Sequence, residues 1–245
     1  ARLLDSNPAE GILRLNSEYP KDGFWWDSQL RITPPFPSGP HFLEPYAHAV
    51  AELDACRITR GGLFLDKAHS EALRQFAPAY RALPRKKFTV VDTNTDPVVL
   101  RTLVDGDTRY FYLVNRDCYP VEVQVSFSGI PDALRDLATG KAVDAGPGWP
   151  LTLEPYQLRS FAMNPKTEVT AFTATPPVEI VQELTDSANR AMEAFQRLRD
   201  NGRAVPGTEE MESRIRAALA RTRVAWLRRA LSSYIVRRSL AEAGL

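Results

Sequence analysis

The feature that most constrains the fold is a series of short segments, between residues 86 and 170, in which hydrophobic residues come at the spacing of β-strands. One example, from Asp107 to Gly129, reads DTRYFYLVNRDCYPVEVQVSFSG and is interrupted only at Cys118-Tyr119-Pro120. This spacing predicts β-strands. Turn residues such as Asp105-Gly106 predict hairpins between them.

Six such segments make up this region. They are KFTVVDT, VVLRTLVDG, TRYFYLVNR, VEVQVSFSG, ALRDLATGKAV and LTLEPYQLRSFAMN. Several short strands at this spacing, separated by turn residues, are typical of an antiparallel β-sandwich. We therefore predict a β-sandwich domain over residues 86–170.

The preceding region, residues 1–85, has the pattern of an α/β unit. A candidate strand from Gly11 to Tyr19 is followed by a long loop rich in proline, glycine and aromatic residues. The segment FLEPYAHAVAELDA then has helical spacing, CRITRGGLFL reads as a strand, and DKAHSEALRQFAPAYRALP reads as a helix that begins at Asp66 and ends at Pro84. This order predicts one βαβ unit with a trailing helix.

The last region, residues 171–245, is almost wholly helical in pattern. An apolar stripe begins near Val178, and Asn201-Gly202 ends that helix. A second stripe runs from about Thr208 toward the C-terminus. Two long helices joined by a short loop are predicted to pack as an antiparallel helical hairpin.

Composition excludes several classes of function. The formal net charge of +1 gives no general reason to expect nucleic acid as a partner, and no apolar run approaches the ~20 residues of a membrane span. The two cysteines, Cys56 and Cys118, have neither disulfide-framework nor metal-ligand spacing, and the three histidines form no metal-binding pair. We therefore expect no metal, no cofactor, no nucleic acid and no membrane partner, and the residues indicate no compartment.

The second tail helix is nevertheless basic, with nine arginines and four glutamates between Arg203 and Leu245. Such a helix is compatible with a membrane surface or with phosphate groups. The first tail helix carries several acidic residues, and complementary charge between the two helices is the simpler interpretation.

Four segments carry a resemblance to a known class of enzymes. In chain order they are YRALP, YFYLVN, LRDLATGKAV and LTLEPYQLRSF. The final segment has apolar residues, then Pro-Tyr, then a basic residue and an aromatic; the matching residues are Leu153, Pro155, Tyr156, Arg159 and Phe161. This order resembles the C-terminal part of clan-A-type retaining glycoside hydrolases, in which a TIM barrel precedes a β-sandwich. The resemblance covers roughly residues 40 to 165 and does not explain the helical tail.

The resemblance implies that CRITRGGLFL is the last barrel strand and that the helix after it is the last barrel helix. A complete barrel takes about 250 residues, whereas only residues 1–85 precede the sandwich. The implied fold class is α+β and multidomain: terminal βα elements of a TIM barrel, an antiparallel β-sandwich and a C-terminal helical hairpin. The remaining strands would then come from a longer form of the protein or from a partner chain, including a second copy.

Retaining glycoside hydrolases use two carboxyl groups about 5–5.5 Å apart, and barrel enzymes place them at the carboxyl ends of strands. Glu18 follows the candidate strand that begins at Gly11, so it is our candidate catalytic residue. The alternative is a solvated loop glutamate. Asp22 and Asp27, which flank GFWW, are weaker candidates. Asp66 also lies past a strand end, but a role as helix N-cap explains it sufficiently.

The loop segment GFWWDS contains the candidate substrate-binding residues Trp25, Trp26 and Asp27. The flat C–H faces of sugars stack on indole rings, and neighbouring polar groups orient the ligand. The alternative is that the indoles fill an interior. Trp149, in a turn of the sandwich, is predicted to be a packing residue, with a sugar contact as its alternative.

Two functions stay open from the residues. The first is hydrolysis of glycosidic bonds by a glycoside hydrolase-like protein of which this chain is the C-terminal portion. The second is a non-catalytic module for carbohydrate binding or self-association. A pair of carboxylates on barrel strands would distinguish them, and Glu18 is the one that this sequence offers.

Overall fold

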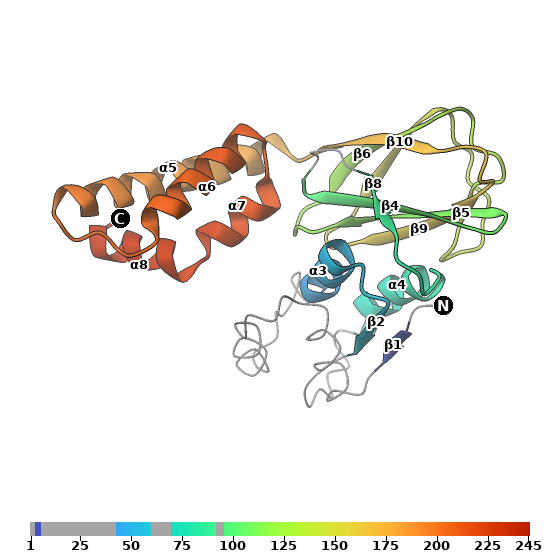
Figure 1. The fold of residues 1–245 in the computed structure, drawn as a ribbon, viewed down its shortest axis with the longest axis horizontal. Helices are drawn as coiled ribbons and strands as arrows, with labels where there is room; N and C mark the ends of the chain where they lie inside the picture. Colours follow the sequence, from blue (N-terminus) through green and yellow to red (C-terminus); the bar gives the residue numbers. More distant parts are fainter. Residues whose placement is uncertain (1–2, 6–42, 60–69, 92–95) are drawn as a thin grey trace. The chain divides into compact units, whose positions relative to one another are not determined.

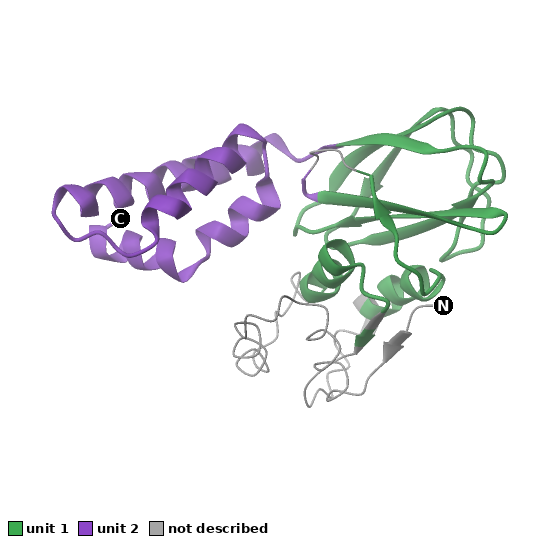
Figure 2. Cartoon of the chain, in the orientation of Figure 1, with its two compact units in different colours: residues 1–93, 98–173 green, residues 94–97, 174–245 purple. Residues whose placement is uncertain are grey.

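The computed structural model describes residues 3–5, 43–59, 70–91 and 96–245 (Figure 1). The chain forms two compact units (Figure 2). The first contains residues 1–93 and 98–173, and the second contains residues 94–97 and 174–245. Helices and antiparallel sheets are both present, so the α+β class is confirmed. The three-domain division at residues 85 and 170 stays a prediction.

Eight strands of the first unit form two sheets. The strands are β3 (Thr89–Val90), β4 (Val98–Asp105), β5 (Thr108–Asn115), β6 (Val121–Phe127), β7 (Arg135–Asp136), β8 (Gly148–Leu153), β9 (Leu158–Met163) and β10 (Val169–Thr175). The five-stranded sheet has the order β3-β4-β5-β9-β7, and the three-stranded sheet has the order β10-β6-β8. The β4–β5, β5–β9 and β6–β8 pairs are antiparallel. The predicted hairpin turn is present: Asp105 pairs with Thr108, and Gly106 has the positive φ that such a turn requires.

Aromatic side chains join the two sheets face to face. The ring centroids of Phe111 and Phe161, on the five-stranded sheet, lie 5.1 Å apart. From the three-stranded sheet, Phe127 contacts Phe111 at 5.9 Å and Trp149 contacts Phe161 at 5.0 Å in an edge-on arrangement. All four rings are buried. Edge-on and offset contacts of this kind add to the apolar area that the core removes from water.

One predicted strand is two strands in the structure. LTLEPYQLRSFAMN contains β8 and β9, which belong to different sheets. Between them Tyr156 has a φ of 55°, and its backbone N–H donates to the carbonyl oxygen of Asp117 at 3.1 Å. The chain therefore turns a corner at Pro155-Tyr156, which alternation alone does not reveal.

Two further strand predictions differ from the structure. ALRDLATGKAV contains only the two-residue β7, because Asp136 Oδ1 accepts hydrogen bonds from the backbone N–H groups of Ala138 and Thr139 and so forms a turn. Strand β10 was not predicted, although it buries Val169 and Phe172.

The remaining described part of this unit contains β1 (Leu3–Asp5), α3 (Glu44–Leu53), β2 (Arg57–Thr59) and α4 (Ser70–Arg81). Strands β1 and β2 are parallel, with Leu3 opposite Arg57 and Asp5 opposite Thr59. The order strand, helix, strand, helix is therefore present, although its first strand was not predicted. Its first strand is β1, and the predicted strand from Gly11 to Tyr19 lies outside the described residues.

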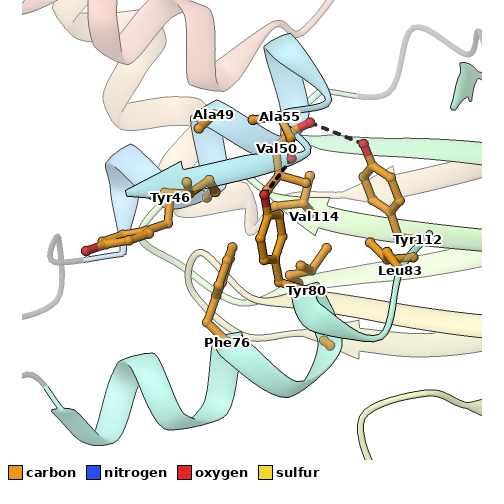
Figure 3. Packing of buried hydrophobic residues seen from close by; sticks show 14 of the residues in the cluster. Tyr46, Ala49, Val50, Ala55, Phe76, Tyr80, Leu83, Tyr112 and Val114 are labelled. Carbon is orange, nitrogen blue, oxygen red and sulfur yellow. Dashed lines mark hydrogen bonds between the residues drawn. The ribbon is translucent and has the colours of Figure 1, made fainter. Parts of the chain in front are cut away.

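Helices α3 and α4 pack against the five-stranded sheet (Figure 3), on the face opposite to the three-stranded sheet (Figure 1). Tyr46 and Phe76, one from each helix, are in contact with a centroid distance of 6.0 Å. Phe88, just before β3, contacts Tyr112 of β5 at 5.2 Å. The cluster also contains Val114 and Leu158. The βα elements and the sandwich thus share one hydrophobic core.

The second unit consists of α5 (Val178–Asp200), α6 (Thr208–Ala220), α7 (Val224–Leu231) and α8 (Tyr234–Ala243). The prediction of the first helix is confirmed by α5. The prediction of one long second helix is wrong, because the chain there forms the three helices α6, α7 and α8. One break has Thr222 at a φ of 49°, and at the other Ser233 caps α8 by accepting from the N–H of Val236. The apolar stripe continues through both breaks because all four helices face one cluster, which includes Phe195, Ile215, Leu227 and Val236.

In the described part of the chain, no helix is both long and apolar enough to cross a membrane.

Candidate functional site

The carboxyl ends of β1 and β2 define one edge of a parallel strand pair. Because the strands are parallel and in register, Asp5 and Thr59, their last residues, end at the same edge. Residues 6–43 connect β1 to α3, and residues 60–69 connect β2 to α4. In barrels and open α/β sheets, ligands bind at this edge, in the connections that follow the strands. This edge is our candidate functional site.

The residues predicted from sequence for this site all belong to the first connection, and they are Glu18, Trp25, Trp26 and Asp27. All four lie outside the described residues, as does Asp66 in the second connection. Their roles stay predictions. Their position along the chain, after a strand that pairs in parallel with the next strand, is the position in which a barrel carries its functional residues.

The junction between α3 and β2 is held by a buried carboxyl group. Asp54 ends α3 in the left-handed conformation, with a φ of 50°, and is 3% exposed. Its Oδ2 accepts from the backbone N–H of Phe88 at 2.6 Å, and its Oδ1 accepts from the hydroxyl of Tyr112 at 2.7 Å. The junction is therefore tied to the sandwich through two side-chain hydrogen bonds.

An arginine from the sheet holds the same end of α3. The side chain of Arg101, on β4, is buried; its Nη2 donates to the carbonyl oxygens of Ala51 at 2.9 Å and of Glu52 at 3.4 Å. Carbonyl groups in the last turn of a helix lack partners within the helix and carry partial negative charge, so a cation stabilises them. A second donor of Arg101, Nη1, binds the carbonyl oxygen of Phe88 at 3.3 Å.

Two hydroxyl groups complete this arrangement. Tyr80 of α4 donates to the carbonyl oxygen of Ala55 at 2.7 Å, directly before β2 (Figure 3). Ser160 of β9 donates to the carbonyl oxygen of Ala79 at 2.8 Å. These contacts fix the βα unit on the sheet in one position, and a fixed support is what a site at the strand ends requires. Sequence reasoning missed them; the one available signal was an arginine inside the apolar strand VVLRTLV.

Other residues considered from sequence have structural roles. Trp149 is 8% exposed and packs between the sheets, which confirms its packing role. Asp105 pairs with Lys86, with 2.7 Å between Oδ1 and Nζ. Cys56 and Cys118 are half-buried. Among the residues that the structure describes, no three histidine, cysteine or acidic side chains gather to hold a metal ion.

Comparison with known proteins gives partial matches in structure only. No family model matches the sequence, and no curated protein matches it. A candidate alpha-galactosidase/melibiase from Bacteroides fragilis NCTC 9343 matches 52% of this chain and 29% of its own, at 17% identity and a TM-score of 0.37. A glycoside hydrolase family 30 subfamily 8 xylanase from Clostridium acetobutylicum matches 53% of this chain and 41% of its own, at 12% identity and a TM-score of 0.33. This chain therefore spans less than half the length of either protein.

Proposed function

We propose that this chain is the C-terminal portion of a glycoside hydrolase-like protein that acts on a carbohydrate. The observation that carries the proposal is the parallel β1–β2 pair, whose flanking helices share one core with an antiparallel sandwich. This is the order expected where a barrel ends and its accessory sandwich begins. The sandwich supports the site and does not itself carry the chemistry.

In this proposal the reaction is hydrolysis of a glycosidic bond with retention of configuration. In the first step, one carboxylate attacks the anomeric carbon while a carboxylic acid gives its proton to the leaving oxygen, and a covalent glycosyl intermediate forms. In the second step, the residue that acted as the acid deprotonates a water molecule, which then releases the sugar from the intermediate. Glu18 supplies one of these carboxyl groups. The other belongs to barrel strands beyond this chain, in a longer form of the protein or in a partner.

The two tryptophans bind the sugar in this proposal. Trp25 and Trp26 stack on the C–H faces of the rings, and Asp27 accepts hydrogen bonds from their hydroxyl groups. Stacking adds affinity in the ground state and in the transition state alike, so removal of the indoles is expected to raise KM more than it lowers kcat.

The test compares Glu18→Gln with Glu122→Gln in the product of the complete gene, using aryl glycosides as substrates. Glu122 is exposed on β6 and serves as the matched control. Loss of a catalytic carboxyl group is expected to lower kcat by a factor of 10² to 10⁴ or more, roughly the range of general acid–base catalysis, while the control keeps its turnover. Equal turnover in the two variants would remove Glu18 from the catalytic role.

The same protein distinguishes the non-catalytic alternative. If no glycoside is hydrolysed but oligosaccharides still bind, and binding is lost in a Trp25→Ala, Trp26→Ala variant, then the chain belongs to a carbohydrate-binding module. Native mass spectrometry of this material also shows whether a second polypeptide or a second copy of the chain completes the barrel.

A further inference from the structure

A pocket of about 160 Å³ lies at the corner between α6 and α7, entirely within the second unit. It is lined by three arginines, two alanines and a tryptophan, namely Arg214, Arg221, Arg223, Ala217, Ala218 and Trp226. The guanidinium carbon of Arg214 lies 5.8 Å from the centroid of the Trp226 ring, which is within the range of a cation–π contact. The left-handed Thr222 turns the chain here, so Arg221 and Arg223 line the same pocket.

Two of these arginines have unbalanced charge. Neither Arg221 nor Arg223 has an ion pair or side-chain hydrogen bond to any residue that the structure describes. Other arginines of this unit are paired: Arg199 and Arg216 both contact Glu212, at 2.7 and 2.6 Å. Ion pairs with Glu212 therefore account for the positions of Arg199 and Arg216. No such ion pair within the described part of the chain accounts for Arg221 and Arg223.

The chain that forms the pocket contains few acidic residues. The sequence has no aspartate or glutamate between Glu212 and Glu242, whereas it has eight arginines in that interval. Glu210 lies 3.5 Å from Arg214, and both side chains are exposed. Asp96 Oδ2 accepts from the backbone N–H groups of Ala225 and Trp226 at 2.6 and 3.4 Å, so that carboxyl group caps α7. Two unpaired guanidinium groups beside a neutral indole remain for a ligand.

The size and chemistry of the pocket define that ligand. A cavity of about 150 Å³ holds one six-membered ring, and Trp226 is half-buried with a surface that lines the pocket. Guanidinium groups bind carboxylate and sulfate groups through paired hydrogen bonds. The ligand is thus a single ring that carries an oxyanion and has an apolar face for the indole.

We propose that this pocket binds one acidic sugar residue, a uronic acid or a sulfated sugar, within an anionic oligosaccharide. Arg221 and Arg223 bind its oxyanion, and Trp226 lies against the C–H face of its ring. The choice of a sugar rests on the proposed function above. In that setting the helical unit is a binding module that holds an acidic carbohydrate.

The test measures binding of oligogalacturonate to the complete chain by titration calorimetry, with a neutral oligosaccharide of equal length and inorganic sulfate as comparisons. The Arg221→Gln, Arg223→Gln variant is expected to bind oligogalacturonate about ten times more weakly. The matched control is Arg190→Gln, Arg203→Gln, which removes two exposed arginines of the same unit outside the pocket. It is expected to keep the original Kd, and added salt is expected to weaken binding.

Several results would overturn the proposal. An equal loss in both double variants would mean that general charge attracts the ligand. Equal affinity for the neutral oligosaccharide or for sulfate alone would exclude an acidic ring as the ligand. Tighter binding of a single-stranded oligonucleotide of equal charge would assign the pocket to nucleic acid instead.

The two proposals fail in different ways. If the arginine pocket is wrong, the Arg221→Gln, Arg223→Gln variant binds oligogalacturonate normally, while Glu18 and Trp25 still control turnover. If the proposed hydrolase is wrong, turnover is absent, while the calorimetric effect of Arg221 and Arg223 remains.

Discussion

Removing one hydroxyl group from the interface between α3 and the sandwich should destabilise the first unit. Tyr112 is fully buried, and its hydroxyl donates to Asp54 Oδ1 at 2.7 Å. The Tyr112→Phe substitution keeps the ring in contact with Phe88 but takes one donor from a carboxyl group that is only 3% exposed. A buried polar group that loses a partner costs roughly 1–3 kcal/mol of stability, so we expect the free energy of unfolding to fall by about 2 kcal/mol. For a unit of this size that is about 4–8 °C in Tm.

Differential scanning calorimetry measures this shift, and Tyr110→Phe is the control. Tyr110 lies two residues away on β5, is half-buried at the margin of the same cluster, and its hydroxyl has no hydrogen bond to another described residue. Its substitution should change Tm by less than about 2 °C, since it removes no buried partner. If both variants lower Tm equally, ring contacts and not the Asp54 hydrogen bond account for the effect, and the reasoning is refuted.

Two other substitutions test neighbouring inferences. Arg101→Met keeps the apolar stem of the side chain but leaves the carbonyl groups of Ala51 and Glu52 without their donor. We expect the free energy of unfolding, measured in urea, to fall by about 2 kcal/mol. The control is Arg135→Met, at an exposed position, which should change the free energy of unfolding little. Glu212→Gln tests the helical unit: the hydrogen bond from Arg216, together with Arg199 and against the effect of burial, lowers the pKa of Glu212 below its ordinary value of 4.5. A lowered folded-state pKa stabilises the fold above pH 4.5, and that stability is lost as the pH falls through the folded value. The variant should therefore be less stable at pH 7 but lose less stability between pH 5 and pH 2; a parallel pH profile for both proteins would contradict this inference.

The parts of the fold that sequence reasoning predicted are those in which local pattern and tertiary structure agree. Strands β4, β5 and β6 are rich in β-branched and aromatic residues and are separated by strong turn residues, so their bounds follow the pattern closely. Helix α5 has an unbroken stripe and Asn201-Gly202 directly after its end, and it was predicted correctly.

The errors arise where tertiary packing overrides a continuous pattern. An apolar stripe persists from α6 to α8 because all three helices face one core, so the stripe does not show the breaks at Thr222 and Ser233. Likewise, apolar alternation continues through Pro155-Tyr156, although the chain passes there from one sheet to the other. The buried contacts of Asp54 and Arg101 depend on residues far apart in the chain, and composition has no signal for them. The candidate site residues Glu18, Trp25 and Trp26 remain predictions.

The two sheets differ in how many of their faces are buried. An antiparallel sheet usually has one solvated face, and β6 of the three-stranded sheet follows this rule, with Val121, Val123 and Val125 buried and Glu122 and Gln124 exposed. In β5 of the five-stranded sheet, every residue from Phe111 to Asn115 is buried. Phe111 faces the other sheet, whereas Tyr112 and Val114 face α3 and α4. The five-stranded sheet is therefore a central layer between the βα elements and the second sheet. Removal of α3 and α4 would expose Tyr112 and Val114, so the five-stranded sheet depends on these helices for the burial of one of its faces.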